Sequence, residues 1–395
     1  MTVALGGRER GVAAGFVLAV VLVGVNLRAA LTGVGPLLPN ISADAGLSPA
    51  WGGALTALPL VTFAVLSPLV ARVLRRGAVR LMVPVLAVLV AGLLIRSGPG
   101  LPSLFLGTVI LSAALAFANV LLPSMVRGGV PGRRIAAVTA AYVTAMTAAA
   151  ATASGIAVPL AERLPGGWRT VLAAWALPAV VALAIWWRRR PAETAPPAHR
   201  ARLPWRSPLA WQVSLFMGLQ SLGFYATISW LPSILRDNGV SARDAGIYLF
   251  GFQLLGLLAL NGVPLLRRAV VGPRLLAVAA SLLDAAGFLL LAVAPGFAPV
   301  AVFAIGLGAG ICLVLALSFQ SERAADEAQA AALAGMAQGI GYLVAAVGPL
   351  LLGLLHSAIG GWTAALTTLA LLTVWQAAMG FGAGRDRFVD APVGR

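Results

Sequence analysis

LPNISADAGLSPAWGG, at residues 38–53, returns as LPSILRDNGVSARDAG at residues 231–246. The two stretches share residue types at a constant offset of 193 residues, in the pairs Pro39 and Pro232, Gly46 and Gly239, Ser48 and Ser241, and Gly53 and Gly246. A Gly-Gly-Trp motif at residues 166–168 is repeated at residues 360–362, 194 positions later. An offset kept over so much of the chain predicts two halves related by parallel duplication.

The composition places these halves in a membrane. Hydrophobic residues make up 60% of the 395 residues and charged residues 10%, and the mean hydropathy is +0.95. Such a chain has too little polar surface for a water-soluble globule. Apolar runs of about 20 residues, long enough to cross a bilayer, occur at residues 11–36, 49–71, 79–97, 101–126, 134–160, 168–187, 208–235, 242–266, 274–294, 297–319, 328–356 and 361–382.

We therefore expect an all-α integral membrane protein with twelve transmembrane helices in two pseudo-symmetric six-helix bundles. The expected units are an N-terminal bundle at residues 1–187, a Pro- and Arg-rich linker at residues 188–207, and a C-terminal bundle with a short tail at residues 208–395. The first apolar run is too long for the core of a signal peptide, so we expect it to remain as the first span.

The basic residues indicate the orientation of the chain. All 28 are arginines, and 22 of them lie at the termini or in the loops on the side of the termini. The opposite side carries five, namely Arg96, Arg163, Arg169, Arg236 and Arg243. By the positive-inside rule, we expect both termini in the cytoplasm and the protein in the cytoplasmic (inner) membrane. The loop arginines suit anionic lipid headgroups, and no pattern of aromatic and basic residues indicates a nucleic-acid partner.

One arginine lies inside an apolar run. Arg28 belongs to VNLRAALTGVGPLLP at residues 25–39, and an arginine at a helix centre costs roughly 2.5 to 3.5 kcal/mol on insertion scales. Gly24, Thr32 and Gly35 share its helical face, which predicts open space beside the guanidinium. A guanidinium offers paired donors to a small anion, a nitro group or a carboxylate. We expect Arg28 to bind substrate; the alternative is a structural arginine paired with backbone carbonyls or a carboxylate.

Further polar side chains lie in the middle of spans and are candidates for the same site. They are Asn26, Thr32, Asn119, Tyr142, Gln220, Ser221, Tyr225, Gln253, Gln338 and Tyr342. Ser221 is the counterpart of Arg28 at the offset of 193 residues, so the positive charge is asymmetric between the halves. Hydrogen bonds that only hold helices together are the alternative for each of these residues. Trp211 and Trp230 are expected at the membrane interfaces.

Asp284 is the only carboxylate near the middle of a span. It is a candidate for proton coupling, although its span is expected at the periphery, and a protonated Asp bonded to a neighbouring helix is the alternative. Cys312 is expected to be a buried hydrophobe, and His356 a packing or interface residue. With two histidines, one cysteine and no nucleotide-binding or hydrolase motif, the sequence predicts no metal, no cofactor and no enzyme.

The sequence resembles the major facilitator superfamily, and within it the family of cyanate and 2-nitroimidazole transporters. The resemblance is carried by NLR at residues 26–28 followed by LTGVGPLLP, by NVLLP at residues 119–123, and by FMGLQSLGFYATISWLP at residues 216–232. It implies a secondary transporter that moves a small polar or anionic solute, cyanate-like or nitroimidazole-like, by alternating access. Family members often carry a proline after NLR. Here Ala29 takes its place, so any kink is expected from Gly33, Gly35 and Pro36.

The loop between spans two and three departs from the superfamily pattern. It reads ARVLRRG at residues 71–77 and has no acidic residue, which leaves the usual charge pair between the halves without a carboxylate here. The expected partners are a small solute, the lipid bilayer and, in one version of the mechanism, a coupled proton, with the monomer as the functional unit. The alternative functions are a drug or xenobiotic efflux carrier, a non-transporting receptor on a carrier scaffold and, least favoured, an ion channel.

Overall fold

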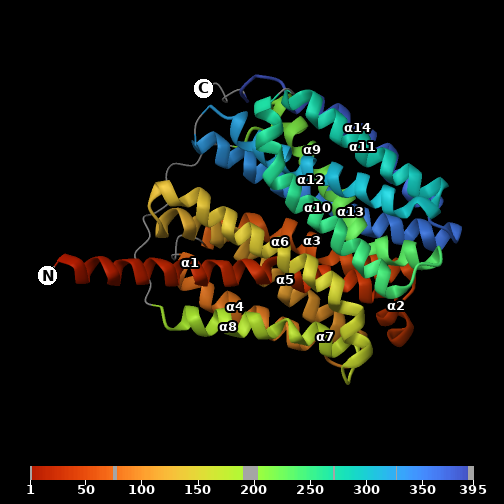
Figure 1. Cartoon of the computed structure of the whole chain (residues 1–395), viewed down its shortest axis with the longest axis horizontal. Coiled ribbons are helices and arrows are strands. Elements are labelled where there is room, and N and C mark those ends of the chain that lie inside the picture. The colour runs from red at the N-terminus through yellow and green to blue at the C-terminus, as the bar shows by residue number, and fades with distance from the viewer. Residues whose placement is uncertain (1, 74–77, 190–202, 270–271, 326, 390–395) are drawn as a thin grey trace.

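The computed structural model describes residues 2–73, 78–189, 203–269, 272–325 and 327–389 (Figure 1). Its regular elements are helices: α1 (Thr2–Thr32), α2 (Val34–Ala45), α3 (Pro49–Val73), α4 (Ala78–Arg96), α5 (Gly100–Gly129), α6 (Gly132–Arg163), α7 (Trp168–Ala174), α8 (Ala176–Trp187), α9 (Pro208–Asp237), α10 (Ala242–Ala269), α11 (Pro273–Val293), a short 3-10 turn η2 (Pro295–Phe297), α12 (Ala298–Glu322), α13 (Glu327–Ile359) and α14 (Thr363–Ala383). Most of the predicted linker and the Arg75–Arg76 pair lie outside the described residues.

These elements form the twelve predicted membrane helices, two of them interrupted. The first is α1 with α2, interrupted at Gly33, and the sixth is α7 with α8, interrupted at Trp175. Each interruption is followed by a proline, Pro36 and Pro178, which lacks the N–H that would bond to the carbonyl four residues earlier. The freed carbonyl of Thr32 instead accepts a hydrogen bond from Ser154 Oγ at 3.3 Å. The kink was predicted from Gly33, Gly35 and Pro36, and it lies at these residues.

Within the described residues, nine helical stretches are long and apolar enough to cross a membrane, and Leu81–Arg96 is a shorter apolar helix. Helix α9 is not among the nine, although it is 30 residues long. It carries Gln220, Ser221 and a series of further polar side chains, which lower its hydropathy. A polar helix of this length is stable in a membrane only when other helices cover it, and α9 is covered by α13, α14, α2, α10 and α12.

The helices are grouped in two bundles, as predicted (Figure 1). The N-terminal half, red to yellow, lies below the C-terminal half, green to blue, and both chain ends lie at the left of the view. One apolar core lies mainly in the N-terminal half and a second in the C-terminal half. A third cluster contains residues of both halves, from α2 and α3 to α9 and α13. The side on which α2 and α9 end, opposite the chain termini, is called the distal side below.

The internal repeat has a structural counterpart on the distal side. Trp168 Nε1 donates a hydrogen bond to Asp44 Oδ2 at 3.3 Å, and Trp362 Nε1 donates one to Asp237 Oδ2 at 2.7 Å. Both carboxylates belong to the repeated stretch that opened the sequence comparison. In each half, the end of the first membrane helix is therefore joined to the start of the sixth by the same pair of residue types.

The two halves meet tightly on the distal side. A Cβ on Gly53 of α3 would lie 2.6 Å from the carbonyl oxygen of Pro349 in α13, so only glycine allows this approach. A Cβ on Gly35 of α2 would collide with the carbonyl oxygen of Ile228 in α9. The Ala50 N–H also donates to Ser357 Oγ at 3.1 Å across the same seam. The structure is thus closed between the halves on the distal side.

The expectation for Trp230 is wrong, and Arg323 differs from a simple loop arginine. Trp230 was expected at a membrane interface, but it is buried, and its Nε1 donates to the Pro349 carbonyl at 2.8 Å, which joins α9 to α13. Arg323 lies in the loop between α12 and α13, as expected, but its side chain is buried and donates from Nε to the Ala383 carbonyl at 3.1 Å and from Nη1 to Asp386 Oδ1 at 3.4 Å. A long amphipathic side chain near a helix end can turn inward when backbone carbonyls are available there.

Candidate functional site

Arg28 lies where the two halves meet, beside an aromatic ring of the other half. Its Cζ stands 5.1 Å from the centroid of the Phe224 ring, which belongs to α9 of the other half. Phe224 in turn meets the Tyr225 ring edge-on at 5.3 Å. Tyr342 of α13 interacts electrostatically with Arg28 and with Tyr225. Its ring packs edge-on against the Phe63 ring, with 5.4 Å between the centroids.

Among the described residues, the Arg28 guanidinium has no hydrogen bond or ion pair, and it is only half-buried. The ring of Phe224 satisfies part of its charge, since a cation over an aromatic face is attracted by about 0.5 to 2 kcal/mol. A cation with free donors beside aromatic walls can accept an anion or a nitro group through N–H donors and a planar ring through stacking.

Gly24 and Gly35, which were predicted to leave open space beside Arg28, are packed against neighbouring helices instead. A Cβ on Gly24 would lie 2.9 Å from the backbone oxygen of Tyr142, so α6 packs directly on α1 there. The space beside Gly35 is filled in the same way by the backbone of α9 at Ile228. Small residues on one face of a helix serve close packing as well as cavities, and here they serve packing.

Thr32 and Gln253 take part in one hydrogen-bond network rather than pointing freely to a solute. Thr32 Oγ1 donates to the Ala150 carbonyl at 3.0 Å, and Gln253 Nε2 donates to Ser154 Oγ at 2.7 Å and to the Ala150 carbonyl at 3.2 Å. The network joins α1 and α6 of one half to α10 of the other. These side chains therefore hold the halves together on the distal part of the interface.

Three further predicted residues are satisfied within their own helix. Asn26 is buried and donates from Nδ2 to the Leu22 carbonyl at 2.7 Å. Gln220 is buried as well and donates from Nε2 to Ser221 Oγ at 2.6 Å and to the Met217 carbonyl at 3.1 Å. Ser221, the counterpart of Arg28 in the repeat, is thus the acceptor of a neighbouring amide.

Asn119 and Gln338 remain available, whereas Tyr142 is part of the packing. Asn119 in α5 and Gln338 in α13 are half-buried, and within the described part of the chain their amides have no hydrogen-bond partner. Tyr142 is buried in the core of the N-terminal half. The structure therefore groups Arg28 with Tyr225 and Tyr342 and the unpredicted Phe224, and it leaves two amides unengaged.

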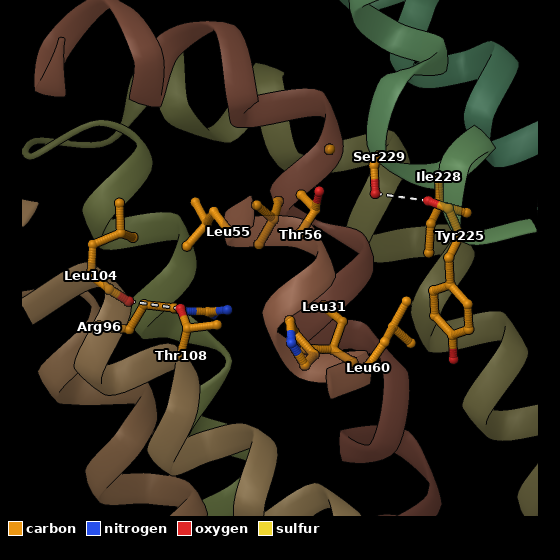
Figure 2. Close-up of a pocket in the computed structure, with 13 residues that line it drawn as sticks. Leu31, Leu55, Thr56, Leu60, Arg96, Leu104, Thr108, Tyr225, Ile228 and Ser229 are labelled. Atoms are coloured by element: carbon orange, nitrogen blue, oxygen red, sulfur yellow. Dashed lines mark hydrogen bonds between the residues drawn. The ribbon is translucent and has the colours of Figure 1, made fainter. Parts of the chain in front are cut away.

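The burial of Arg96 was not predicted from the sequence. Arg96, expected in a loop of the distal side, is the last residue of α4 and only 1% exposed. Its side chain turns into the protein, where Nη1 donates to the Ala30 carbonyl at 2.7 Å. It lines a pocket together with Thr56, Thr108, Tyr225 and Ser229 (Figure 2). The sequence held one signal for this: Arg96 falls inside the predicted span 79–97 rather than after it.

Asp284 lies inside the C-terminal half, away from Arg28. It is 2% exposed in α11, and a Cβ on Gly308 of α12 would lie 2.8 Å from its own Cβ, so α11 and α12 are in direct contact there. Its Oδ1 has no hydrogen-bond partner in the described residues. One turn away, Ser281 Oγ lies 3.5 Å from Cys312 Sγ and accepts from Gln376 Nε2 at 3.1 Å.

The sequence profile described as Major Facilitator Superfamily matches residues 16–349. The chain belongs to the major facilitator superfamily. It is 39% identical to the 2-nitroimidazole transporter of Escherichia coli K12 over 397 aligned residues, which cover 97% of this chain and 98% of that protein. It is 31% identical to the cyanate transport protein CynX of the same organism, covering 87% of this chain and 91% of that protein.

Solved structures of superfamily members share the fold. A bacterial homologue of the human lysosomal transporter Spinster, in an inward-facing and occupied conformation, superposes with a TM-score of 0.80 at 18% identity, covering 94% of this chain and 98% of the other. The D-xylose-proton symporter superposes with a TM-score of 0.73 at 14% identity, covering 96% and 99%. This member of the superfamily is therefore a multi-pass membrane protein and a secondary transporter of small solutes, not an enzyme.

Proposed function

We propose that this carrier moves a small anionic or nitro-bearing solute and that Arg28 is its principal binding group. One observation supports this most directly: an arginine at the interface of the two halves has no carboxylate partner among the described residues and rests on an aromatic ring of the other half. Unpaired charge in a membrane interior is costly and is typical of a functional site. The names of the relatives, a 2-nitroimidazole transporter and a cyanate transport protein, indicate the same kind of solute.

The chemistry of the walls suits such a solute. The guanidinium donates two parallel N–H bonds to the oxygens of a nitro or carboxylate group, or one to the end of a linear anion. Tyr225 and Tyr342 add hydroxyl donors nearby, and Phe224 offers a face on which a five-membered ring stacks. Asn119 and Gln338, whose amides have no partner among the described residues, are further candidates to donate to the solute and accept from it.

The proposed transport cycle moves residues 1–187 against residues 208–395 about this site, with residues 188–207 as the linker. Arg28 belongs to the first unit and Phe224, Tyr225 and Tyr342 to the second, so each movement rebuilds the site. The termini, rich in arginine, are placed in the cytoplasm and the protein in the inner membrane, as a monomer bordered by anionic lipid. The state described here is then closed toward the outside of the cell.

The binding role of Arg28 is tested by thermal stabilisation of purified protein with cyanate and with 2-nitroimidazole. A ligand at 100 times its Kd stabilises the folded state by about 2.7 kcal/mol. We expect this stabilisation in the wild type and in Arg163→Gln, which removes an exposed arginine at the distal end of α6. We expect its loss in Arg28→Gln and its weakening in Arg28→Lys, since lysine keeps the charge but loses the planar fork. Unchanged stabilisation in both Arg28 variants would refute the role.

Proton coupling through Asp284 is a separate part of the proposal. It is supported by the buried, unbonded Oδ1 and by the lack of any other carboxylate in the middle of a described helix. Asp284→Asn keeps the shape and removes the titrating group, so we expect loss of uptake driven by external acidification in liposomes. Equilibrium exchange of labelled solute, which needs no proton gradient, is the matched control and is expected to persist. Acid-driven uptake in the Asn variant equal to that of the wild type would remove Asp284 from the mechanism.

Efflux of drugs is the second candidate function, because aromatic contacts extend outward from Arg28: Phe224 packs against Phe252, and Tyr342 packs against Phe63. Such walls also suit a hydrophobic xenobiotic. Stabilisation by lipophilic cations, equal in the wild type and Arg28→Gln and absent with anions, would favour efflux over the proposal. Solute flux into liposomes that contain the purified protein would exclude a non-transporting receptor.

A further inference from the structure

We propose that Arg96 forms a second anion site, on the distal side of Arg28, that captures the solute when the carrier is open to the distal side. The proposal rests on the proposed function for the kind of solute, but it concerns a different residue and pocket. It follows from three features: the burial of Arg96, the composition of its pocket, and the origin of the residues that close the pocket.

Arg96 is a buried cation whose donors are largely unused. The side chain is 1% exposed, and its Nε and Nη2 atoms have no hydrogen-bond partner among the described residues. Only Nη1 is engaged, with the Ala30 carbonyl. No described carboxylate lies within ion-pair distance. A buried charge is normally paired because leaving it unpaired costs several kcal/mol, so the two unpartnered nitrogens of this desolvated guanidinium point to an anionic partner.

The pocket in front of Arg96 has the remaining groups such a partner needs. Figure 2 shows Arg96 and Thr108 on one side of the pocket and Tyr225, Ile228 and Ser229 of α9 on the other, with Thr56 of α3 between them. Three hydroxyl-bearing residues, Thr56, Thr108 and Ser229, now donate to backbone carbonyls of their own helices. Their oxygens keep acceptor capacity, and each hydroxyl can rotate to donate to an anion instead.

The closure of the pocket is reversible because it depends on the other half. Arg96, Thr56 and Thr108 belong to the N-terminal half, whereas Tyr225, Ile228 and Ser229 belong to α9 of the C-terminal half. Gly35 seals the same place by its contact with the Ile228 carbonyl. Movement of the C-terminal half away from the distal side removes α9 from the pocket, and Arg96 then faces the distal solvent.

The two arginines lie one after the other along the path. Arg96 bonds to the carbonyl of Ala30, two residues beyond Arg28 in α1, and Tyr225 borders both the Arg96 pocket and the ring that covers Arg28. An anion that enters from the distal side therefore meets Arg96 first and passes Tyr225 to reach Arg28. A pair of weak, adjacent sites favours both entry and release, which a single tight site does not.

The test uses a reporter cysteine in the pocket. The single native cysteine, Cys312, is buried and is replaced by serine; Thr56→Cys then supplies one thiol beside Arg96. Intact cells are treated from outside with membrane-impermeant thiol reagents of opposite charge, with and without thiocyanate, a linear monovalent anion. Gluconate, too bulky for the pocket, replaces thiocyanate at equal ionic strength. The same measurements are made with Arg96→Gln and with Arg163→Gln, which removes an exposed distal arginine.

We expect the anionic reagent to react at least tenfold faster than the cationic one, and thiocyanate to slow its reaction several-fold. Both effects are expected to vanish in Arg96→Gln and to persist in Arg163→Gln and Arg28→Gln. Equal rates for the two reagents, no protection by thiocyanate, or no labelling of the thiol would overturn the proposal. All three contradicting outcomes are measured in the reporter protein that keeps Arg96. The proposal therefore stays refutable even if Arg96→Gln fails to fold. Solute binding that survives Arg28→Gln would instead refute the proposed role of Arg28 and leave this result standing.

Discussion

The distal contact between α3 and α13 allows a quantitative prediction. In Gly53→Ala, the new Cβ would lie 2.6 Å from the Pro349 carbonyl oxygen and 3.2 Å from Leu350 Cα. Non-bonded heavy atoms prefer about 3.5 Å or more. In the variant, α3 and α13 therefore cannot approach each other as closely as the closed distal side requires. Overpacking of this kind typically costs about 1 to 3 kcal/mol. Because the contact joins the two halves, the cost falls only on the state described here.

The expected consequence is a shift of the conformational equilibrium toward the distally open state. At about 1.4 kcal/mol per factor of ten, a cost of about 2 kcal/mol raises the ratio of distally open to distally closed molecules roughly 30-fold. Alanine is also a better helix former than glycine by about 0.5 to 1 kcal/mol, but this gain applies to both states and cancels.

The shift is measured with Ser229→Cys in the Cys312→Ser background. Ser229 is buried in α9 under the closed distal side, so its labelling rate by an external thiol reagent follows the distally open population. We expect roughly 30-fold faster labelling in Gly53→Ala. Gly52→Ala is the matched control, since its Cβ would meet only side-chain atoms, a Trp230 ring atom at 3.3 Å and Leu38 methyl groups at 3.4 Å, so the required shift is a few tenths of an ångström at most. Equal labelling rates in Gly53→Ala, Gly52→Ala and the parent chain would refute the reasoning.

Two further predictions concern single contacts. Trp362→Phe removes the 2.7 Å bond to Asp237 but keeps a ring to stack on His356, so we expect a loss of about 1 kcal/mol and a lower melting temperature. Trp168→Phe is expected to cost less, because its bond to Asp44 is longer and Arg169 still pairs with that carboxylate; the opposite order of melting temperatures would contradict this. Phe224→Leu removes the ring that positions the Arg28 guanidinium, so we expect three- to tenfold weaker solute binding, corresponding to about 0.5 to 1.5 kcal/mol. Phe224→Tyr keeps the ring and should bind like the wild type, and equal titration curves for the Leu and Tyr variants would count against the contact.

Much of the fold followed from local sequence properties. Apolar length and helical period are properties of each segment alone, and they located all twelve membrane helices, including the kink near Gly33 and Pro36. The repeat predicted two bundles, and Asp44 with Trp168 and Asp237 with Trp362 show the same hydrogen bond in both. Arg28 was singled out because a charge in a long apolar run is costly wherever its partner lies.

The sequence by itself determined the helices, their duplication and the presence of an arginine inside the first apolar run, because each depends on residues close together in the chain. Only the tertiary structure decided which side chains face which. Gly24 and Gly35 pack against α6 and α9 instead of leaving a cavity, Thr32 and Gln253 join helices, and Arg96 turns inward from the end of α4. The physical reason is that a small or polar residue fits close packing, an interhelical bond or a solute equally well, and the helix opposite it determines which of these forms.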